Sequence, residues 1–484
     1  MNLPGLLRLR RALILLGALA LIGSSVDAQS ASETLVAEPG SERIAVPLGV
    51  IAGRNEPLEE TFGLPEKLNE LLAASALGDE LEVSAFPTAP GVRERVLLRR
   101  VDVFAEGARA FVIDQNGRRE VPRSARLHFV GHAADAPERR FALSLNPKTR
   151  SLRGSVHTPA GASQIDDFSA LDAQTSIIRK ASAALESQGI QLQSSCGSDL
   201  LAVDPTPRPS FAKRSRSLHT ISSSSQATRR ITIAVDTDNE FNHYKFGNDT
   251  SAALDWIADL FAEMNLMYER DLLLNLQLGD TFLRLDSGDL AFDDDPYDVN
   301  SAGTSSAHLD EFGDYWQANM GGVNRVFAAL LSGKSGSDYS SSGIAWLDGY
   351  CESQSWGGGY SVTQIFKANI NVSYDAKIVG HEIGHNLGSP HTHCYSPPID
   401  QCFNGENSCY GGSTSCPGSG AGTLMSYCHL LSGCGSTASL HSGVVDRLDD
   451  YLQSHEGWCV VPYSPSTIFG DDFESGSLGT WFLP

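Results

Sequence analysis

The sequence predicts two folded regions, a β-rich region over residues 29–202 and an α/β domain over residues 229–462. Short runs of alternating apolar residues fill the first region, and strands alternate with helices in the second. Between them, residues 203–228 have the Pro, Ser and Arg content of a linker. With 484 residues, 41% of them hydrophobic, the chain is long enough for two or three domains with their own cores.

The first 28 residues have the pattern of a secretory signal peptide. Arginines at positions 8, 10 and 11 precede an apolar run over 12–22, and Val26-Asp27-Ala28 resembles an A-x-A cleavage site. The run is too short for a stable membrane span, and no later segment is long and apolar enough to cross a bilayer. We therefore expect a soluble secreted protein with no membrane span, which passes through the periplasm if the source is bacterial.

The β-rich region is predicted from four short runs separated by glycine, proline and asparagine. These runs are RVLLRRVDVF (95–104), RLHFVG (126–131), RFALSL (140–145) and LRGSVH (152–157). The stretch SALDAQTSIIRKASAALES (169–187) that follows is predicted to be helical. The linker over 203–228 carries basic sites that are open to proteolysis.

The α/β domain is predicted from strands at 230–235, 272–279 and 342–351, with a further strand or buried segment within 321–333. Apolar residues at three- and four-residue steps mark an amphipathic helix between the first two strands, namely Leu254, Ile257, Leu260, Phe261, Met264 and Met267. Strands that alternate with helices indicate an α/β sandwich. The tail over 463–484 has the composition of a further linker.

Acidic residues are concentrated in the second half of the chain. Residues 1–228 hold 26 Lys+Arg and 25 Asp+Glu, whereas residues 229–484 hold 10 and 33, a net charge of −23. This charge argues against nucleic acid as a partner. It fits either a solubilising surface or a preference for cationic substrates or bound Ca2+. The one local acidic run, Asp293-Asp294-Asp295, is explained equally well by a solvated loop.

Eight of the nine cysteines lie after residue 350, in a segment rich in Gly, Ser, Asn and Pro. They are Cys351, Cys394, Cys402, Cys409, Cys416, Cys428, Cys434 and Cys459. An even set in an exported domain predicts up to four disulfides, and an oxidising compartment disfavours a cysteine-rich zinc site. Cys196 is left without a partner in its own region.

The segment VGHEIGHNLGSPHTHC (379–394) predicts a catalytic metal centre. His381 and His385 are four residues apart and share one helix face, with Glu382 beside the metal. Gly388 ends the helix in a left-handed conformation, and His391 returns as the third ligand. Three protein ligands leave one position for water, as in catalytic zinc sites.

The motif HEIGHNLGSPH resembles that of the metzincin zinc endopeptidases, and GHNLG is most similar to their adamalysin (reprolysin) branch, here in a bacterial-type secreted form. The likeness extends over about 229–462, through the opening strand RITIAVDTDNEF, the helix end MNLMYERDL and the edge strand GIAWLDGYC. GTLMSYC supplies Met425 for a methionine turn. The resemblance implies a metzincin-like α/β catalytic domain, with a twisted mixed sheet, a zinc helix and a methionine turn, preceded by a β-rich prodomain.

The resemblance also implies a reaction, the hydrolysis of peptide bonds in a protein or peptide substrate. One Zn2+ would polarise the scissile carbonyl, and Glu382 would act as general base and then general acid. The substrate would lie extended along the 343–350 edge. Adamalysins usually carry Asp directly after the third histidine, where this chain has Thr392, so the support beneath the site is expected to differ.

Two residues near the expected centre have two interpretations each. From its composition alone, Met425 is a buried gap-filler in a Gly/Ser-rich loop, and even in the family it shapes the site without acting in catalysis. Tyr427 lies two residues after it, the spacing at which some metzincins place a tyrosine that reaches the metal or the developing oxyanion. Simple packing is the alternative for Tyr427.

The resemblance further suggests how the precursor is kept inactive and how the cysteines pair. Cys196-Gly197 near the end of the prodomain resembles the metzincin arrangement in which a thiolate takes the open zinc position, so the prodomain is expected to be the inhibitor. Alternatively, Cys196 is an incidental thiol or pairs with one of the other eight. The family also suggests the disulfides Cys351–Cys459 and Cys394–Cys428.

Two other functional classes stay open. One is a catalytically silent binding protein on the same fold, against which the intact metal motif argues. The other is a zinc amidase that acts on a non-peptide or cell-wall amide, against which the expected edge strand and methionine turn argue.

Overall fold

The computed structural model describes residues 42–45, 59–158, 161–167, 175–180, 193–198, 201, 227–286, 295–349, 358–368, 372–418 and 420–463. The predicted signal peptide, most of the predicted linker, Cys351 and all of the tail except Tyr463 lie outside these residues. All described residues belong to one compact unit, Ala37–Pro484. Within them, no helix is both long enough and apolar enough to cross a membrane.

The N-terminal region is β-rich, as predicted, and forms a sheet with the strand order β1-β3-β4-β7-β8-β9-β10-β11-β2. All neighbours are antiparallel except β1 and β3. Helix α1 (Glu66–Ala74) buries Leu68 and Leu72 in a core with Phe86, Phe129 and Phe141. The strands are β1 Glu42–Ala45, β2 Glu59–Gly63, β3 Glu80–Ala89, β4 Val92–Val101, β7 Leu127–Ala133, β8 Ala136–Leu145, β9 Leu152–Thr158, β10 Gly161–Asp167 and β11 Thr175–Lys180.

The helix predicted over 169–187 is wrong where the structure describes that segment. Residues Thr175–Lys180 form strand β11, which pairs antiparallel with β10 and with β2. Ile177 and Ile178 are buried, and their branched side chains, with Thr175 before them, favour a strand over a helix. The rest of the predicted helix lies outside the described residues.

A second, mixed sheet confirms the predicted α/β character of the C-terminal region. Its strand order is β12-β16-β17-β15-β13-β14-β5-β6, with β18 beside β13. The pairs β17–β15–β13–β14 are parallel, whereas β16 runs antiparallel to β17. The strands from this region are β13 Arg229–Thr237, β14 Leu274–Arg284, β15 Phe327–Ser332, β16 Ser340–Ala345, β17 Tyr360–Gln364 and β18 Val461–Pro462.

Helices cover both faces of this sheet, because alternate residues of each strand belong to different cores. Ile233 of β13 and Leu331 of β15 pack in the core of helices α3 (Thr250–Leu272), α5 (Val372–Asn386) and α6 (Ser442–Ser454). Ala234 and Leu330 pack instead against helix α4 (Ser306–Asn319). The helix predicted from the apolar spacing at 254–267 is α3, whose first turn is capped by the Asp249 side chain.

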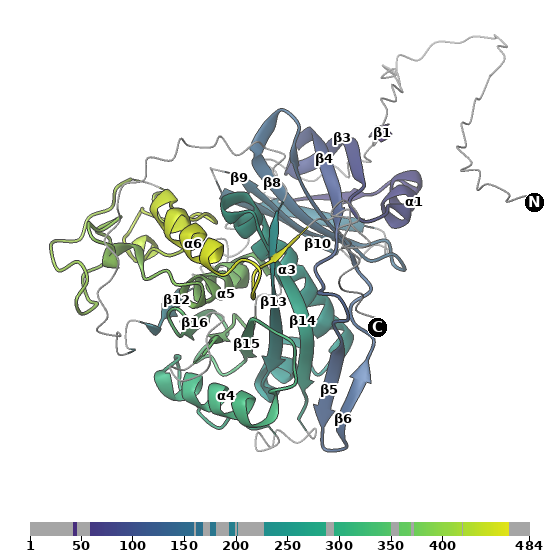
Figure 1. Cartoon of the computed structure of the whole chain (residues 1–484). Helices are drawn as coiled ribbons and strands as arrows, with labels where there is room; N and C mark the ends of the chain where they lie inside the picture. The colour runs from purple at the N-terminus through teal and green to yellow at the C-terminus, as the bar shows by residue number, and fades with distance from the viewer. Residues whose placement is uncertain are drawn as a thin grey trace, which may run out of the picture. The chain divides into compact units, whose positions relative to one another are not determined.

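Strands from the N-terminal region fill both edges of the second sheet (Figure 1). At one edge, β5 (Ala110–Asp114) pairs in parallel with β14 and forms a hairpin with β6 (Gly117–Val121). At the other edge, β12 (Gln193–Cys196) pairs in parallel with β16. The edge at which a substrate strand was expected is therefore occupied by a segment of the same chain.

Candidate metal centre and active site

Helix α5 and the turn after it bring three histidines together. His381 and His385 lie on one face of α5, which ends at Asn386. Gly388 has φ +102°, and a Cβ there would lie 2.1 Å from Asp348 Oδ1, so only glycine fits this turn. The reversal returns the chain to place His391, which is fully buried, beside the other two.

The three imidazoles point their Nε2 atoms at one another. Their separations are 3.0 Å for His381–His385, 3.1 Å for His385–His391 and 3.2 Å for His381–His391. Ligands of a tetrahedral zinc ion at about 2.0–2.1 Å would lie about 3.3 Å apart, so the spacing fits such an ion. Burial lowers the pKa of His381 to about 3 and that of His385 well below its usual value, which keeps both lone pairs free.

Each imidazole also has an acceptor beside its other nitrogen. The Nδ1 of His381 lies 2.6 Å from the Leu424 carbonyl, and that of His385 lies 2.7 Å from the Ser389 carbonyl. These contacts place the ring protons on Nδ1, so bare lone pairs converge at Nε2. Three converging lone pairs repel one another unless a cation lies between them. The three Nε2 atoms therefore fit a zinc ion as their common ligand-bound metal.

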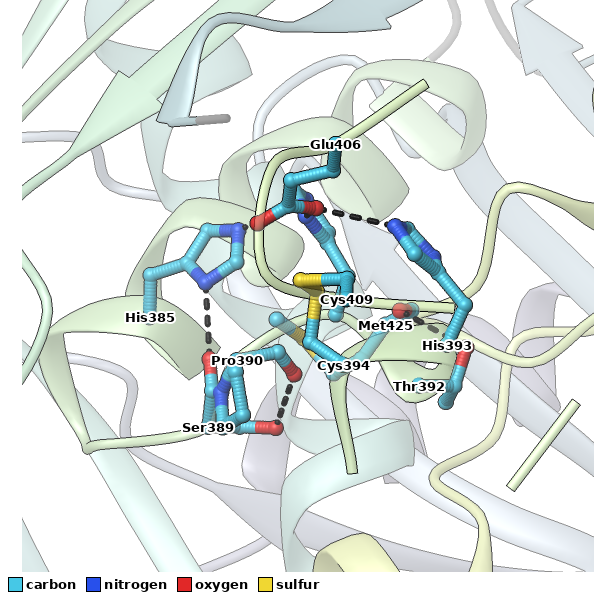
Figure 2. Close-up of a disulfide and its surroundings, with 10 residues drawn as sticks. His385, Ser389, Pro390, Thr392, His393, Cys394, Glu406, Cys409 and Met425 are labelled. Atoms are coloured by element: carbon cyan, nitrogen blue, oxygen red, sulfur yellow. Dashed lines mark hydrogen bonds and ion pairs between the residues drawn. A yellow bond between two sulfur atoms is a disulfide. The ribbon is translucent and has the colours of Figure 1, made fainter. Parts of the chain in front are cut away.

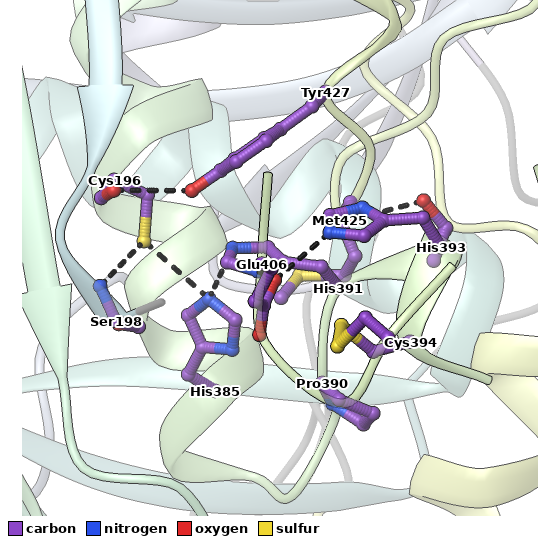
Figure 3. Close-up of polar contacts among 12 residues, drawn as sticks. Cys196, Ser198, His385, Pro390, His391, His393, Cys394, Glu406, Met425 and Tyr427 are labelled. Carbon is purple, nitrogen blue, oxygen red and sulfur yellow. Dashed lines mark hydrogen bonds and ion pairs between the residues drawn. A yellow bond between two sulfur atoms is a disulfide. The ribbon is translucent and has the colours of Figure 1, made fainter. Parts of the chain in front are cut away.

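Cys196 reaches the fourth position of this group (Figure 3). Its Sγ lies 3.6 Å from His385 Nε2 and 3.7 Å from Glu382 Oε2, and it accepts a hydrogen bond from the Ser198 amide at 3.4 Å. The sulfur and the three Nε2 atoms all lie within 4.8 Å of one another. Cys196 is the free cysteine of the described residues, which contradicts the alternative that it pairs with one of the other eight.

Glu382 lies beside this group and is fully buried. Its Oε2 is 3.5 Å from Ser198 Oγ, whereas its Oε1 has no hydrogen-bond partner. Burial raises the pKa of Glu382 to about 8. A Cβ on Gly343 of β16 would lie 2.2 Å from Glu382 Oε1, so the carboxylate depends on a glycine at that strand position.

The turn at Leu424–Met425 packs against helix α5 and the residue after His391. Met425 is fully buried, and its Sδ would lie 2.5 Å from a Cβ on Gly384, which explains why α5 has a glycine there. Thr392 donates to the Met425 carbonyl from its amide at 2.9 Å and from its hydroxyl at 3.2 Å. Thr392, at the position where adamalysins usually carry aspartate, thus ties the segment directly after the third histidine to the turn; Figure 2 shows Thr392 beside Met425.

Tyr427 lies against His391, with ring centroids 4.4 Å apart. Its hydroxyl donates to the Cys196 carbonyl at 3.0 Å. The side chain therefore packs and also directs its polar end toward the segment that covers the histidines.

Two residues of this site were missed by the sequence analysis, Glu406 and His393. Glu406 Oε2 lies 2.8 Å from His391 Nδ1 and 2.9 Å from His393 Nε2. The sequence offered a weak signal, since Glu406 is the single acid between Cys402 and Cys434. Nothing in its spacing relates it to the histidines.

The predicted disulfide Cys394–Cys428 is wrong. The structure pairs Cys394 with Cys409, Cys402 with Cys428 and Cys416 with Cys434. The loop after Cys394 folds back at once, and the Tyr410 amide donates to the His393 carbonyl at 3.1 Å, so Cys409 is the nearer partner. Cys459 is disulfide-bonded, and its predicted partner, Cys351, lies outside the described residues.

Bound calcium, one of the alternatives that the acidic charge left open, gains no support from the described residues. Among the described residues, every group that could hold a metal is built on histidine or cysteine. Asp295 is buried and accepts from the amides of Asn239 at 2.7 Å and Tyr297 at 2.9 Å, so it is not part of a solvated loop. The other two acids of that run lie outside the described residues.

A cavity of about 220 Å³ opens beside Glu382 and His381. Its walls include Ile378, Leu424 and Lys377, together with Ser194 and Ser195 of the N-terminal region. A larger cavity of about 320 Å³ lies between β8–β10 and α3 and has none of the converging histidines in its walls. The smaller cavity is therefore the one that a molecule at the histidines would enter.

Comparison with known proteins agrees with the motif. Residues 227–438 match the family described as Reprolysin_5, metallo-peptidase family M12, which confirms the predicted resemblance to reprolysin-like metzincin peptidases. A solved chain titled "Structure of a chaperone-substrate complex" aligns over 47% of this chain at 15% identity and TM-score 0.29, and the alignment spans 34% of that chain. No curated protein matches the chain.

Proposed function

We propose that the protein is a secreted zinc endopeptidase made as a latent precursor. The observation that carries the proposal is the convergence of three Nε2 lone pairs at 3.0–3.2 Å next to a buried carboxylate. His381, His385 and His391 would hold the ion, which supplies Lewis-acid polarisation of a carbonyl and lowers the pKa of bound water from about 15.7 toward 7. The match to a metallopeptidase family supports a peptide substrate.

Glu382 would move the protons of the reaction. It lies next to the ligands without being one, and its Oε1 is free to accept a proton from the attacking water. It would then pass that proton to the leaving amine. Its raised pKa arises mainly from burial, so the pKa should fall when the covering segment leaves and water enters.

The substrate would bind where β12 now lies. In the precursor the β12 backbone pairs with β16, with Cys196 opposite Gly343, so the edge is already used to bind an extended segment. The Tyr427 hydroxyl, which now donates to the Cys196 carbonyl, would become free to donate to a substrate carbonyl. The 220 Å³ cavity would take one substrate side chain, and the half-buried Lys377 in its wall favours an acidic or polar end.

Latency would come from the N-terminal region acting as a prodomain. The support is the placement of Cys196 Sγ at the fourth position and of β12 along the substrate edge. Cleavage within 203–228 would separate the prodomain from the peptidase.

The test is hydrolysis of casein by the processed protein, with and without a chelator, beside a measurement of bound zinc. We expect hydrolysis that the chelator abolishes and that added zinc restores. Bound zinc without hydrolysis of any protein would indicate a silent binding protein. Cleavage of a cell-wall amide but not of casein would indicate the amidase.

A further inference from the structure

The three histidines are held in two different ways. Backbone carbonyls, those of Leu424 and Ser389, accept from His381 and His385. His391 is held by a side chain, the carboxylate of Glu406 (Figure 3). A backbone acceptor survives most substitutions, whereas a carboxylate can be removed by one.

We propose that Glu406 is the positioning residue of the metal centre, an inference that rests on the proposed zinc site. A carboxylate that accepts from Nδ1 fixes the tautomer and the ring orientation of a ligating histidine. It also makes the other ring nitrogen a more basic, stronger metal ligand. Glu406 Oε2 lies 2.8 Å from His391 Nδ1, so Nε2 is the atom left for the metal. The carboxylate also brings a negative charge close to a centre whose three ligands are neutral.

His393 holds Glu406 in turn. Its Nε2 lies 2.9 Å from the same oxygen, and its ring lies parallel to that of His391, with centroids 5.4 Å and planes 8° apart. His393 is fully buried, and its Nδ1 has no hydrogen-bond partner. A proton on Nδ1 would be an unsatisfied buried donor, so the proton belongs on Nε2, where it is donated to Glu406.

The Cys394–Cys409 disulfide fixes the two partners relative to each other (Figure 2). Cys394 follows His391 by three residues, and Cys409 follows Glu406 by three. The bridge therefore closes a short loop in which His391, the hydrogen-bond donor, and Glu406, the acceptor, each lie three residues before a bridged cysteine. The disulfide is needed to hold the loop in one conformation, because the loop has few apolar residues that could hold it by packing.

A second metal site is the alternative for this group, since His391, His393, Cys394 and Glu406 place potential ligand atoms within 4.8 Å of one another. The disulfide removes the Cys394 thiolate. Glu406 Oε2 is shared by two ring nitrogens, and His391 Nε2 points at His381 and His385. The group is built to support one metal centre and not to bind a second ion.

The experiment compares Glu406→Ala, Glu406→Gln and His393→Ala with Glu456→Ala in the full-length precursor. Glu456 is a matched control because its side chain is 53% exposed. Zinc affinity is measured by competition with a chromophoric chelator, and ligand geometry is followed through the visible absorption of the cobalt-substituted protein. We expect Glu406→Ala to bind zinc about 10- to 100-fold more weakly and to change the cobalt spectrum.

Glu406→Gln should lose less affinity than the alanine variant, because its carbonyl oxygen still accepts from His391 while its charge is gone. It keeps the side-chain volume and therefore tests the proposal even if Glu406→Ala fails to fold. Glu456→Ala should match the wild type. Wild-type affinity and an unchanged cobalt spectrum in Glu406→Gln and Glu406→Ala would overturn the proposal. Because the readout is metal binding, a wild-type protein that binds zinc but cleaves no protein would contradict the proposed function alone.

Discussion

The N-terminal region contacts the α/β domain at two sheet edges that differ in extent and in chemistry. At the β16 edge the contact is β12, four residues long, with Cys196 and Ser198 directed at the histidines and Glu382. At the β14 edge the contact is the β5–β6 hairpin, and a row of acids on α3, which covers one face of the sheet, adds to this second contact. The first contact covers the reactive groups, whereas the second has the larger set of paired polar groups.

The acids of α3 form one stripe, because Asp255, Asp259 and Glu263 recur every four residues. Each meets a different segment of the N-terminal region. Asp255 accepts from Ser124 at 2.6 Å, Asp259 Oδ1 lies 3.0 Å from His128 Nε2, and Glu263 contacts Ser155 and His157. Further along the helix, Arg99 donates to Glu269 at 3.3 Å. Part of the acidity of residues 229–484 therefore binds the N-terminal region and is not a solubilising surface.

In the proposed latent precursor, one contact would block the site and the other would hold the N-terminal region in place. A four-residue strand can cover the site only if something else keeps it there after the linker is cut. The α3 stripe can provide this, since Asp259 and Glu263 are buried and contact polar partners on the N-terminal region, and removing one partner of a buried charged pair leaves an uncompensated charge.

The largest expected effect concerns the chemistry that β12 covers. Glu382→Ala in the processed protein should keep zinc but reduce casein hydrolysis by about 10⁴-fold or more. General acid–base groups contribute about 10²–10⁴-fold, and one group that would serve both proton transfers should lie at or above the top of that range. Hydrolysis rate and bound zinc are measured on the same preparation. Near-normal turnover would contradict the mechanism.

The next effect concerns the strand beneath that carboxylate. Gly343→Ala should reduce hydrolysis by up to about 10²-fold, because the new Cβ would meet Glu382 Oε1 and displace it. Ser341→Ala on the same strand is the control, since it removes a hydroxyl that has no hydrogen-bond partner. Equal rates in the two variants would show that Glu382 adjusts without loss.

The holding contact is tested by Asp259→Ala in precursor whose linker has been cut. Removal of one partner of a buried charged pair costs about 2 kcal/mol or more, so release of the N-terminal region should be at least about thirtyfold faster. Release is followed by size-exclusion chromatography at several times. Asp446→Ala, which removes an exposed acid of α6, should release at the wild-type rate.

The sequence predicted the parts of this arrangement that periodicity and local backbone geometry determine. The spacing of His381 and His385 places them on one helix face, and Gly388 makes the reversal that the structure shows at φ +102°. Strands β13, β14, β15 and β16 of the second sheet were likewise predicted near their observed positions, whereas β17 was not predicted. Such features depend on neighbours within a few residues.

The missed features depend on partners that are distant in sequence. Strand β5 is absent from the predicted runs, and a strand's own residues do not say which sheet it joins. The chain crosses from one sheet to the other within the predicted N-terminal region. Glu406 and the pairing of Cys394 with Cys409 lie in a loop with no apolar period. Their partners are set by how that loop folds back on His393.

The smallest effect is expected from Cys196→Ser in the full-length precursor. The serine oxygen is a weaker zinc ligand than a thiolate, so water should gain access to the fourth position and some premature hydrolysis and self-cleavage should appear. Activity should stay below that of the processed protein, because β12 still pairs with β16 and the α3 stripe still holds the N-terminal region. Casein hydrolysis by the uncut precursor is the measurement, and thiol-modifying reagents should activate the wild type in the same way.

The double variant Cys196→Ser/Asp259→Ala should hydrolyse casein faster than either single variant, because it weakens both contacts. If the Cys196→Ser precursor is as latent as the wild type, the strand alone blocks the site and the thiol has no part in latency.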